Sequence, residues 1–174
     1  MHQQQGDTMS SSEPEFNNAR EYSSLEEVMN TLLTANGKSF RELDKTGRAL
    51  TGGNKGSLGQ IIEESVLKYA INSDAEPDIR IGGTSYELKV TPLKHIKKDK
   101  QTSAKERLVI DIINYLALAD ETDFESSKMW DKARNIILVY YYDDRTDKKK
   151  ELRIDCRVLA SYLMAYEAED RKSV

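Results

Sequence analysis

The chain has 174 residues, with 26 Lys and Arg against 30 Asp and Glu, so its formal net charge is -4. This length suits one compact domain, and the acidic balance excludes a nucleic-acid binder that relies on bulk positive charge. A single cysteine, Cys156, excludes an internal disulfide and a Cys/His zinc site, which favours a cytoplasmic protein. No apolar run is long enough for a membrane span and no signal-peptide pattern opens the chain, so no membrane partner is expected.

The first segment, residues 1–18, is polar and rich in Gln and Ser, which predicts a disordered tail. Ser24 and Glu27 then have the spacing of a capping box, and the apolar residues after them predict a first helix that ends near Asn36–Gly37. A short helical turn over Phe40–Lys45 follows.

A second helix is predicted from Ser57 to Ile71, because apolar residues recur there at helical spacing: Leu58, Ile61, Ile62, Val66 and Tyr69. A helical wheel places Glu64 on the polar side, paired with Lys68. Glu63 falls at the edge of the apolar stripe, with Gly59 one turn before it. Glu63 is therefore the better candidate for a metal or substrate ligand.

Alternating apolar residues on both sides of Gly82–Gly83 predict a β-hairpin. A two-residue turn places Asp78 opposite Glu87, and a four-residue loop instead pairs Asp78 with Lys89 and Arg80 with Glu87. In either register the period of two gathers Asp78, Glu87 and Lys89 on one face, opposite the apolar residues.

Further strands are predicted over Arg107–Tyr115 and Asn135–Tyr142, with a short helix over Ser126–Ala133 between them. A last strand near Leu152–Val158 and a helix over Leu159–Ala168 complete the order. The fold class is α/β, with a mixed β-sheet flanked by helices.

Carboxylates that face each other across two strands repel, which is unfavourable unless a cation lies between them. Their hard oxygens suit Mg²⁺, and a neighbouring ammonium group can orient a water molecule and stabilise developing charge. Asp78, Glu87 and Lys89 could supply these groups.

The residues Pro77-Asp78 followed by Glu87-Leu88-Lys89 resemble the PD-(D/E)XK nuclease signature. Together with Lys55 to Glu63 and Tyr86 to Pro92, they look like the MutH-type branch, which includes type II restriction endonucleases that cut at GATC. The resemblance covers roughly residues 55–142 and implies a restriction-endonuclease-like fold, an Mg²⁺ cofactor and a double-stranded DNA substrate.

Carried over residue by residue, the resemblance implies that Glu63, Asp78 and Glu87 are metal ligands and that Lys89 lies beside the attacking water. It also implies catalytic or phosphate-contacting roles for Lys55 and Lys132. Domains of this type continue into a second lobe that reads the bases. We therefore expect residues 19–174 to be the catalytic domain without that C-terminal recognition lobe.

Other side chains are open to two interpretations. The run that contains Lys94, Lys97 and Lys98 is a candidate contact to the DNA backbone, although such runs are more often solvated loops. For the whole chain, the alternative is a non-catalytic DNA-binding or regulatory domain of a larger enzyme, and a third interpretation is a phosphohydrolase acting on small substrates. The sequence leaves the oligomeric state open.

Overall fold

The computed structural model describes residues 20–48, 56–69, 71, 77–96, 101–110, 123–146 and 151–166. Its helices are α1 (Leu25–Leu33), α2 (Phe40–Leu43), α4 (Gly56–Ile61), the π-helix η1 (Ile62–Val66), the 3-10 turns η2 (Phe124–Ser126) and η3 (Arg153–Asp155), and α6 (Lys128–Ala133). The strands are β1 (Glu21–Tyr22), β2 (Ile79–Ile81), β3 (Thr84–His95), β4 (Thr102–Ala104), β5 (Asn135–Tyr142) and β6 (Val158–Ala165). Among these described residues, no helix is long and apolar enough to cross a membrane.

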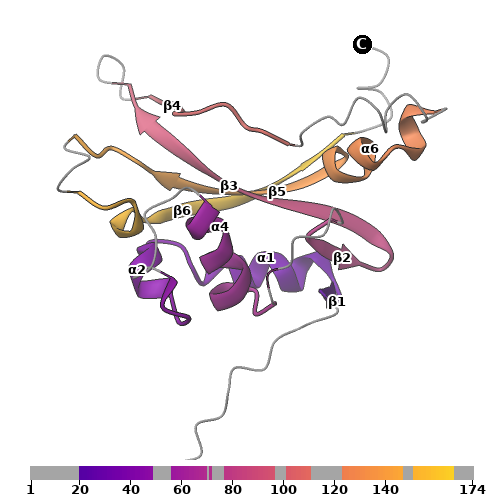
Figure 1. Ribbon diagram of the computed structural model, residues 1–174, viewed down its shortest axis with the longest axis horizontal. Coiled ribbons are helices and arrows are strands. Elements are labelled where there is room, and N and C mark those ends of the chain that lie inside the picture. Colours follow the sequence, from indigo (N-terminus) through magenta and orange to yellow (C-terminus); the bar gives the residue numbers. More distant parts are fainter. Residues whose placement is uncertain are drawn as a thin grey trace, which may run out of the picture.

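The strands form a mixed sheet in the order β1-β2-β3-β5-β6, with β4 paired to the end of β3. Strand β3 is the centre of the sheet because it pairs antiparallel with β2 and β4 and parallel with β5. Helices α1, α2 and α4 lie on one side of the sheet, and α6 lies at the end where β5 begins (Figure 1). The predicted α/β class with a helix-flanked mixed sheet is confirmed.

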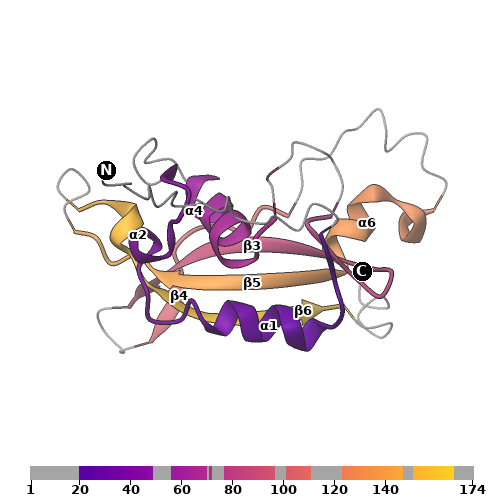
Figure 2. The same cartoon turned by 90° about the horizontal axis from the view of Figure 1, so that it is seen from below.

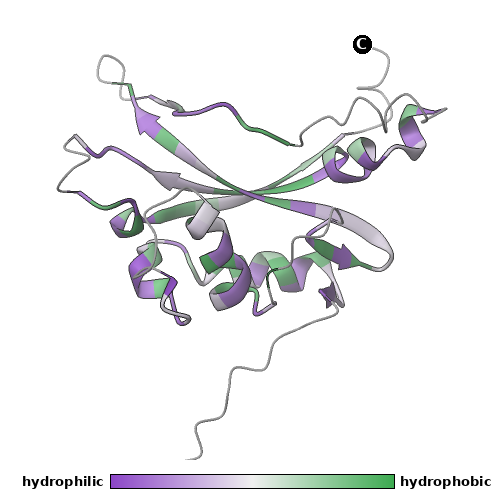
Figure 3. Ribbon diagram, in the orientation of Figure 1, coloured by the Kyte–Doolittle hydropathy of each residue, from purple (hydrophilic) through white to green (hydrophobic). Residues whose placement is uncertain are grey.

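The main core fills the space between the sheet and the helices below it. Its fully buried members include Val28 and Leu32 from α1 and Ile61 from α4, which pack against Ile137 and Val139 of β5. Figure 2 shows α1 running alongside β5 and β6, and the apolar colouring of Figure 3 continues from these helices onto the sheet. The sheet is therefore anchored on this side by apolar packing.

Several predicted elements are present. The first helix begins at Leu25, where the Ser24 hydroxyl accepts a hydrogen bond from the Glu27 amide, and it ends at Leu33, a few residues before the predicted end. The short turn is α2, closed by a complete capping box between Ser39 and Glu42. The predicted strand over Asn135–Tyr142 matches β5 at both ends, and α6 occupies the predicted helix after Ser126.

The second helix is shorter than predicted. Its last part is a π turn, in which the Leu67 amide donates to the Ile62 carbonyl at 2.9 Å, and the chain leaves the helix at Lys68 with a φ of 60°. The extra residue in a π turn shifts every later side chain around the axis relative to an α-helix, so the wheel argument fails beyond Ile62.

Three predictions near the other strands were wrong. Residues 107–110 form no strand, since β5 rather than this segment pairs beside β3, and residues 111–115 lie outside the described part. The predicted strand over Leu152–Val158 contains the 3-10 turn η3, and only its last residue, Val158, belongs to a strand, β6. The segment predicted as a helix from Leu159 is instead β6, because pairing along β5 outweighs the helix propensity of its Leu, Ala and Met residues; residues 167–168 lie outside the described part.

Candidate active site

The β2–β3 hairpin sets the geometry of the candidate site. Gly82 and Gly83 both have positive φ angles, 54° and 80°, which a two-residue hairpin turn requires and glycine adopts without strain. Ile79 pairs with Tyr86, so the two-residue register is confirmed and the four-residue alternative is wrong. Asp78 consequently lies across from Glu87, where its Oδ2 accepts a hydrogen bond of 2.8 Å from the Leu88 amide.

The two faces of the hairpin differ as the alternation predicts. Ile79 and Leu88 are buried in the main core, with Ile81 and Tyr86 packed against it. Glu87 points to the opposite face but is only 5 % exposed, because α6 packs against β3 on that side (Figure 1). The face that carries the acid is therefore enclosed.

Glu87 and Lys89 form an ion pair in which Lys89 Nζ lies 2.7 Å from Glu87 Oε1. The other oxygen, Glu87 Oε2, is buried and accepts no hydrogen bond from the described residues. A buried carboxylate oxygen without a donor is unfavourable, and few such oxygens occur in folded proteins. This oxygen is therefore a candidate ligand for a cation.

Glu63 reaches the site from the first turn of η1. Burial, and after it the charge of Asp78, raises the pKa of Glu63 to about 7. Its Oε1 is the nearest atom that a Cβ at Gly59 would meet, at 3.8 Å. A methyl group at Gly59 would thus be in ordinary van der Waals contact with the carboxylate, so the space beside Gly59 is occupied by Glu63 itself. A π turn in a helix often marks a functional position.

The pKa values of the two hairpin acids are also raised. For Asp78 the cause is burial, which the hydrogen bond from Leu88 and the charge of Lys89 partly oppose. For Glu87 burial comes first and the charge of Asp78 second. The three acids therefore share one electrostatic neighbourhood in which negative charge is unfavourable.

These acids do not form a complete metal cage. Among the described residues, no three His, Cys, Asp or Glu side chains are arranged as metal ligands. The donor set nevertheless fits a hard divalent cation, since it consists of carboxylates that repel one another and includes the unpaired Glu87 Oε2. Binding would require the side chains to move closer together.

Two cations lie near the acids from other elements. Lys132 on α6 lowers the pKa of both Asp78 and Glu87, so the helix directs this lysine toward the hairpin. Arg20 lowers the pKa of Asp78 and Glu63, and its guanidinium lies 5.2 Å from the centre of the Tyr69 ring. Sequence reasoning missed Arg20, because a lone arginine before the first helix gives no local signal.

Of the remaining predicted lysines, the structure describes only Lys94. Lys94 is exposed near the end of β3, seven residues beyond Glu87 and hence about 23 Å away at the usual rise per residue. Lys55, Lys97 and Lys98 lie outside the described residues.

The prediction that Glu64 is a surface residue paired with Lys68 was wrong. Its side chain is only 10 % exposed and forms a two-pronged ion pair with Arg48, whose Nη2 lies 2.7 Å from Glu64 Oε1. The π turn rotates Glu64 away from Lys68, which accounts for the difference.

Comparison with known proteins agrees with the signature on the hairpin. Residues 67–174 match the family described as DNA mismatch repair enzyme MutH, a range that contains Asp78, Glu87, Lys89 and Lys132. Over 120 residues the chain is 39 % identical to the type II restriction enzyme Sau3AI of Staphylococcus aureus, which corresponds to 69 % of this chain and 23 % of that enzyme. The chain thus spans less than a quarter of that relative's length. With more than half of its residues matched, the chain belongs to the MutH family.

Proposed function

We propose that residues 19–174 are the catalytic domain of a type II restriction endonuclease that hydrolyses phosphodiester bonds in double-stranded DNA with Mg²⁺. The observation that carries the proposal is the enclosed pair of Asp78 and Glu87, with a buried, unpartnered Glu87 Oε2 beside the ammonium group of Lys89. The likeness to Sau3AI supports the restriction activity. The GATC target rests on the resemblance of the sequence motifs alone.

In this proposal Asp78, Glu87 and Glu63 hold the metal ion. Bound Mg²⁺ supplies positive charge to the scissile phosphate and makes the attacking water more acidic. Lys89, held 2.7 Å from Glu87 in the free protein, would turn toward the water and orient it. The water oxygen then bonds to phosphorus as one P–O ester bond breaks, a proton of the attacking water passes to solvent, and the leaving oxygen takes up a proton. The ion pair with Glu87 therefore holds the lysine in place before the substrate arrives.

Lysines outside the hairpin contact the DNA backbone. Lys132 lies close enough to lower the pKa of both hairpin acids, which supports a contact between its ammonium group and a phosphate beside the scissile bond. Lys55, Lys94, Lys97 and Lys98 remain proposed DNA contacts. The single cysteine supports the cytoplasmic location expected of a restriction enzyme.

The proposal is tested by incubating the chain with two plasmids that differ only in the presence of GATC sites. We expect Mg²⁺-dependent cutting of the GATC plasmid, with the rate reduced by about a hundredfold or more in Glu87→Gln and Lys89→Ala. The control is Glu26→Gln, which removes a carboxylate from the exposed face of α1. Wild-type rates in both site variants would rule out the assigned residues.

A second candidate is a DNA-binding or regulatory domain without catalysis. It is favoured by the absence of a three-ligand cluster among the described residues. Calorimetric titration of Mg²⁺ into wild type and Asp78→Asn distinguishes the two: the endonuclease predicts a site that the substitution removes, whereas the regulatory domain predicts no difference between the two proteins.

A further inference from the structure

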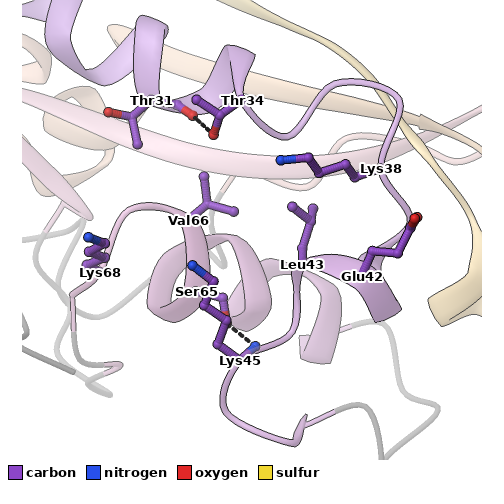
Figure 4. Close-up of a pocket in the computed structure, with 9 residues that line it drawn as sticks. All are labelled: Thr31, Thr34, Lys38, Glu42, Leu43, Lys45, Ser65, Val66 and Lys68. Carbon is purple, nitrogen blue, oxygen red and sulfur yellow. Dashed lines mark hydrogen bonds between the residues drawn. The ribbon is translucent and has the colours of Figure 1, made fainter. Parts of the chain in front are cut away.

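A second cationic site lies on the helical side of the sheet. A pocket of about 410 Å³ opens between α1, α2 and η1. Three lysines line it: Lys38 from the loop after α1, Lys45 from the segment after α2, and Lys68 from the residue that ends the helix. In Figure 4 the side chains of Lys38 and Lys45 approach the middle of the pocket from opposite sides, with Val66 and Leu43 between them.

The positive charge of this pocket is not neutralised. Within the described part of the chain, the ammonium groups of Lys38, Lys45 and Lys68 form no ion pair or hydrogen bond. The one acid in the lining is Glu42, whose Oε2 already accepts from the Ser39 amide and hydroxyl, both at 2.7 Å, and from Arg157 at 3.1 Å. Three exposed like charges around one hollow favour an anionic ligand.

Ser65 adds a neutral hydrogen-bond donor to the pocket. The residue is buried, and its Oγ accepts a bond of 3.0 Å from the Lys45 amide. Its hydroxyl hydrogen has no acceptor among the described residues, which leaves it available to a ligand oxygen. The threonines of the pocket differ, since Thr31 and Thr34 donate their hydroxyl hydrogens to backbone carbonyls of α1.

The volume of the pocket and its apolar lining indicate what kind of anion fits. Leu43 and Val66 form an apolar surface below the lysines and are 7 % and 8 % exposed. The pocket has a volume of about 410 Å³. That is more room than a bare phosphate needs and lies within the range of small-ligand sites.

We propose that this pocket binds a nucleotide unit, with its phosphate between Lys38, Lys45 and the Ser65 hydroxyl and its sugar against Leu43 and Val66. Lys68 also lines the pocket and attracts either the same phosphate or the phosphate of the neighbouring nucleotide. The nucleotide unit is either part of the backbone of a DNA duplex or a free mononucleotide, since both present the same phosphate and sugar. The inference does not depend on cleavage by the hairpin acids.

The first arm of the test measures binding of thymidine 5′-monophosphate by NMR titration of the ¹⁵N-labelled protein. We expect saturable amide shifts at Lys38, Lys45 and Ser65, and an affinity about tenfold or more lower in Lys38→Gln/Lys45→Gln, because the substitutions remove charge-assisted hydrogen bonds. Arg41→Gln is the matched control: it removes one charge from α2 outside the pocket, where Arg41 pairs with the exposed Asp155. Lys45→Arg retains the charge and should retain binding.

The second arm measures affinity for a 16-base-pair duplex without divalent metal across a salt series. If the pocket takes the DNA backbone, the double variant should lower the slope of log K against log salt by about 0.9 for each phosphate that it no longer neutralises. An unchanged slope with loss of mononucleotide binding assigns the site to free nucleotides. Wild-type affinity of the double variant in both arms overturns the proposal, even if the chain cleaves DNA.

Folding of the variants is checked by thermal melting. All three lysines are exposed, and their side chains form no hydrogen bond or ion pair with the described residues, so we expect unchanged melting temperatures. Lys68→Gln provides an independent single substitution and should weaken binding by a smaller factor than the double variant.

Discussion

Replacing Glu63 by glutamine should make the metal-free protein more stable at alkaline pH. Burial and the charge of Asp78 raise the pKa of Glu63 to about 7, so the folded protein holds a proton on this group that the unfolded chain releases near pH 4.5. Because the folded pKa is the higher one, the favourable contribution is complete below pH 4.5 and is lost as the pH rises through about 7. Glutamine remains neutral at every pH and avoids this loss.

The magnitude follows from the size of the pKa change. A rise from 4.5 to about 7 corresponds to about 3 kcal/mol of unfolding free energy lost by pH 8. At pH 5 most of that contribution is still present. The stability of Glu63→Gln relative to wild type should therefore be about 2 to 3 kcal/mol higher at pH 8 than at pH 5.

Urea unfolding at pH 5 and pH 8 in the presence of EDTA measures this difference. Glu26→Gln, an exposed change on α1, is the control and should show the same pH dependence as wild type. A Glu63→Gln protein whose pH dependence equals that of wild type would refute the reasoning, since it would mean that Glu63 ionises in the folded state as freely as in water.

Three further predictions follow from other parts of the structure. Asp143 is fully buried against Lys105 at 3.0 Å and Arg145 at 2.7 Å, so Asp143→Asn should lower the unfolding free energy by about 3 to 5 kcal/mol in urea titrations at pH 7. Burial opposes ionisation of Asp143, but the hydrogen bonds from Arg145 and Lys105 lower the pKa of its carboxyl group below the ordinary 3.8. The stabilisation from the ionised Asp143 is thus present above pH 3.8 and is lost as the pH falls further. The difference in unfolding free energy between wild type and Asp143→Asn should therefore shrink in acid. Gly83→Ala should cost about 1 to 2 kcal/mol by the same assay, because its φ is 80°, whereas Ser85→Ala on the same hairpin should cost less than half of that. Finally, 10 mM Mg²⁺ should raise the melting temperature more at pH 8 than at pH 6, where Glu63 is mostly protonated, and EDTA should abolish the rise; equal rises at both pH values would argue against Glu63 as a ligand.

Features governed by local chemistry could be predicted from the sequence. The hairpin was predictable because Gly82–Gly83 and the alternation around it determine both the turn and the faces, and with them the approach of Asp78 to Glu87. The strand over Asn135–Tyr142 was recognisable from its continuous apolar and aromatic residues.

Features that depend on distant partners could not be predicted. The segment from Leu159 has residues suited to a helix, and only the free edge of β5 makes it a strand. The neighbourhood of Arg20 and Asp78 joins parts of the chain that are far apart in sequence. The π turn depends on how η1 packs against the rest of the chain. Because the π turn sets the direction of Glu64, the ion pair between Glu64 and Arg48 could not be predicted from the sequence either.

The π turn also constrains how this segment can change. Its five residues present Glu63 to the acids and Ser65 to the lysine-lined pocket. Deleting one residue within η1 would restore an ordinary α-helix, and the side chains between Ile62 and Val66 would no longer keep their present directions. Relatives that lack the additional residue cannot be aligned to this chain without a gap, and a single deletion here would disturb two separate surfaces at once.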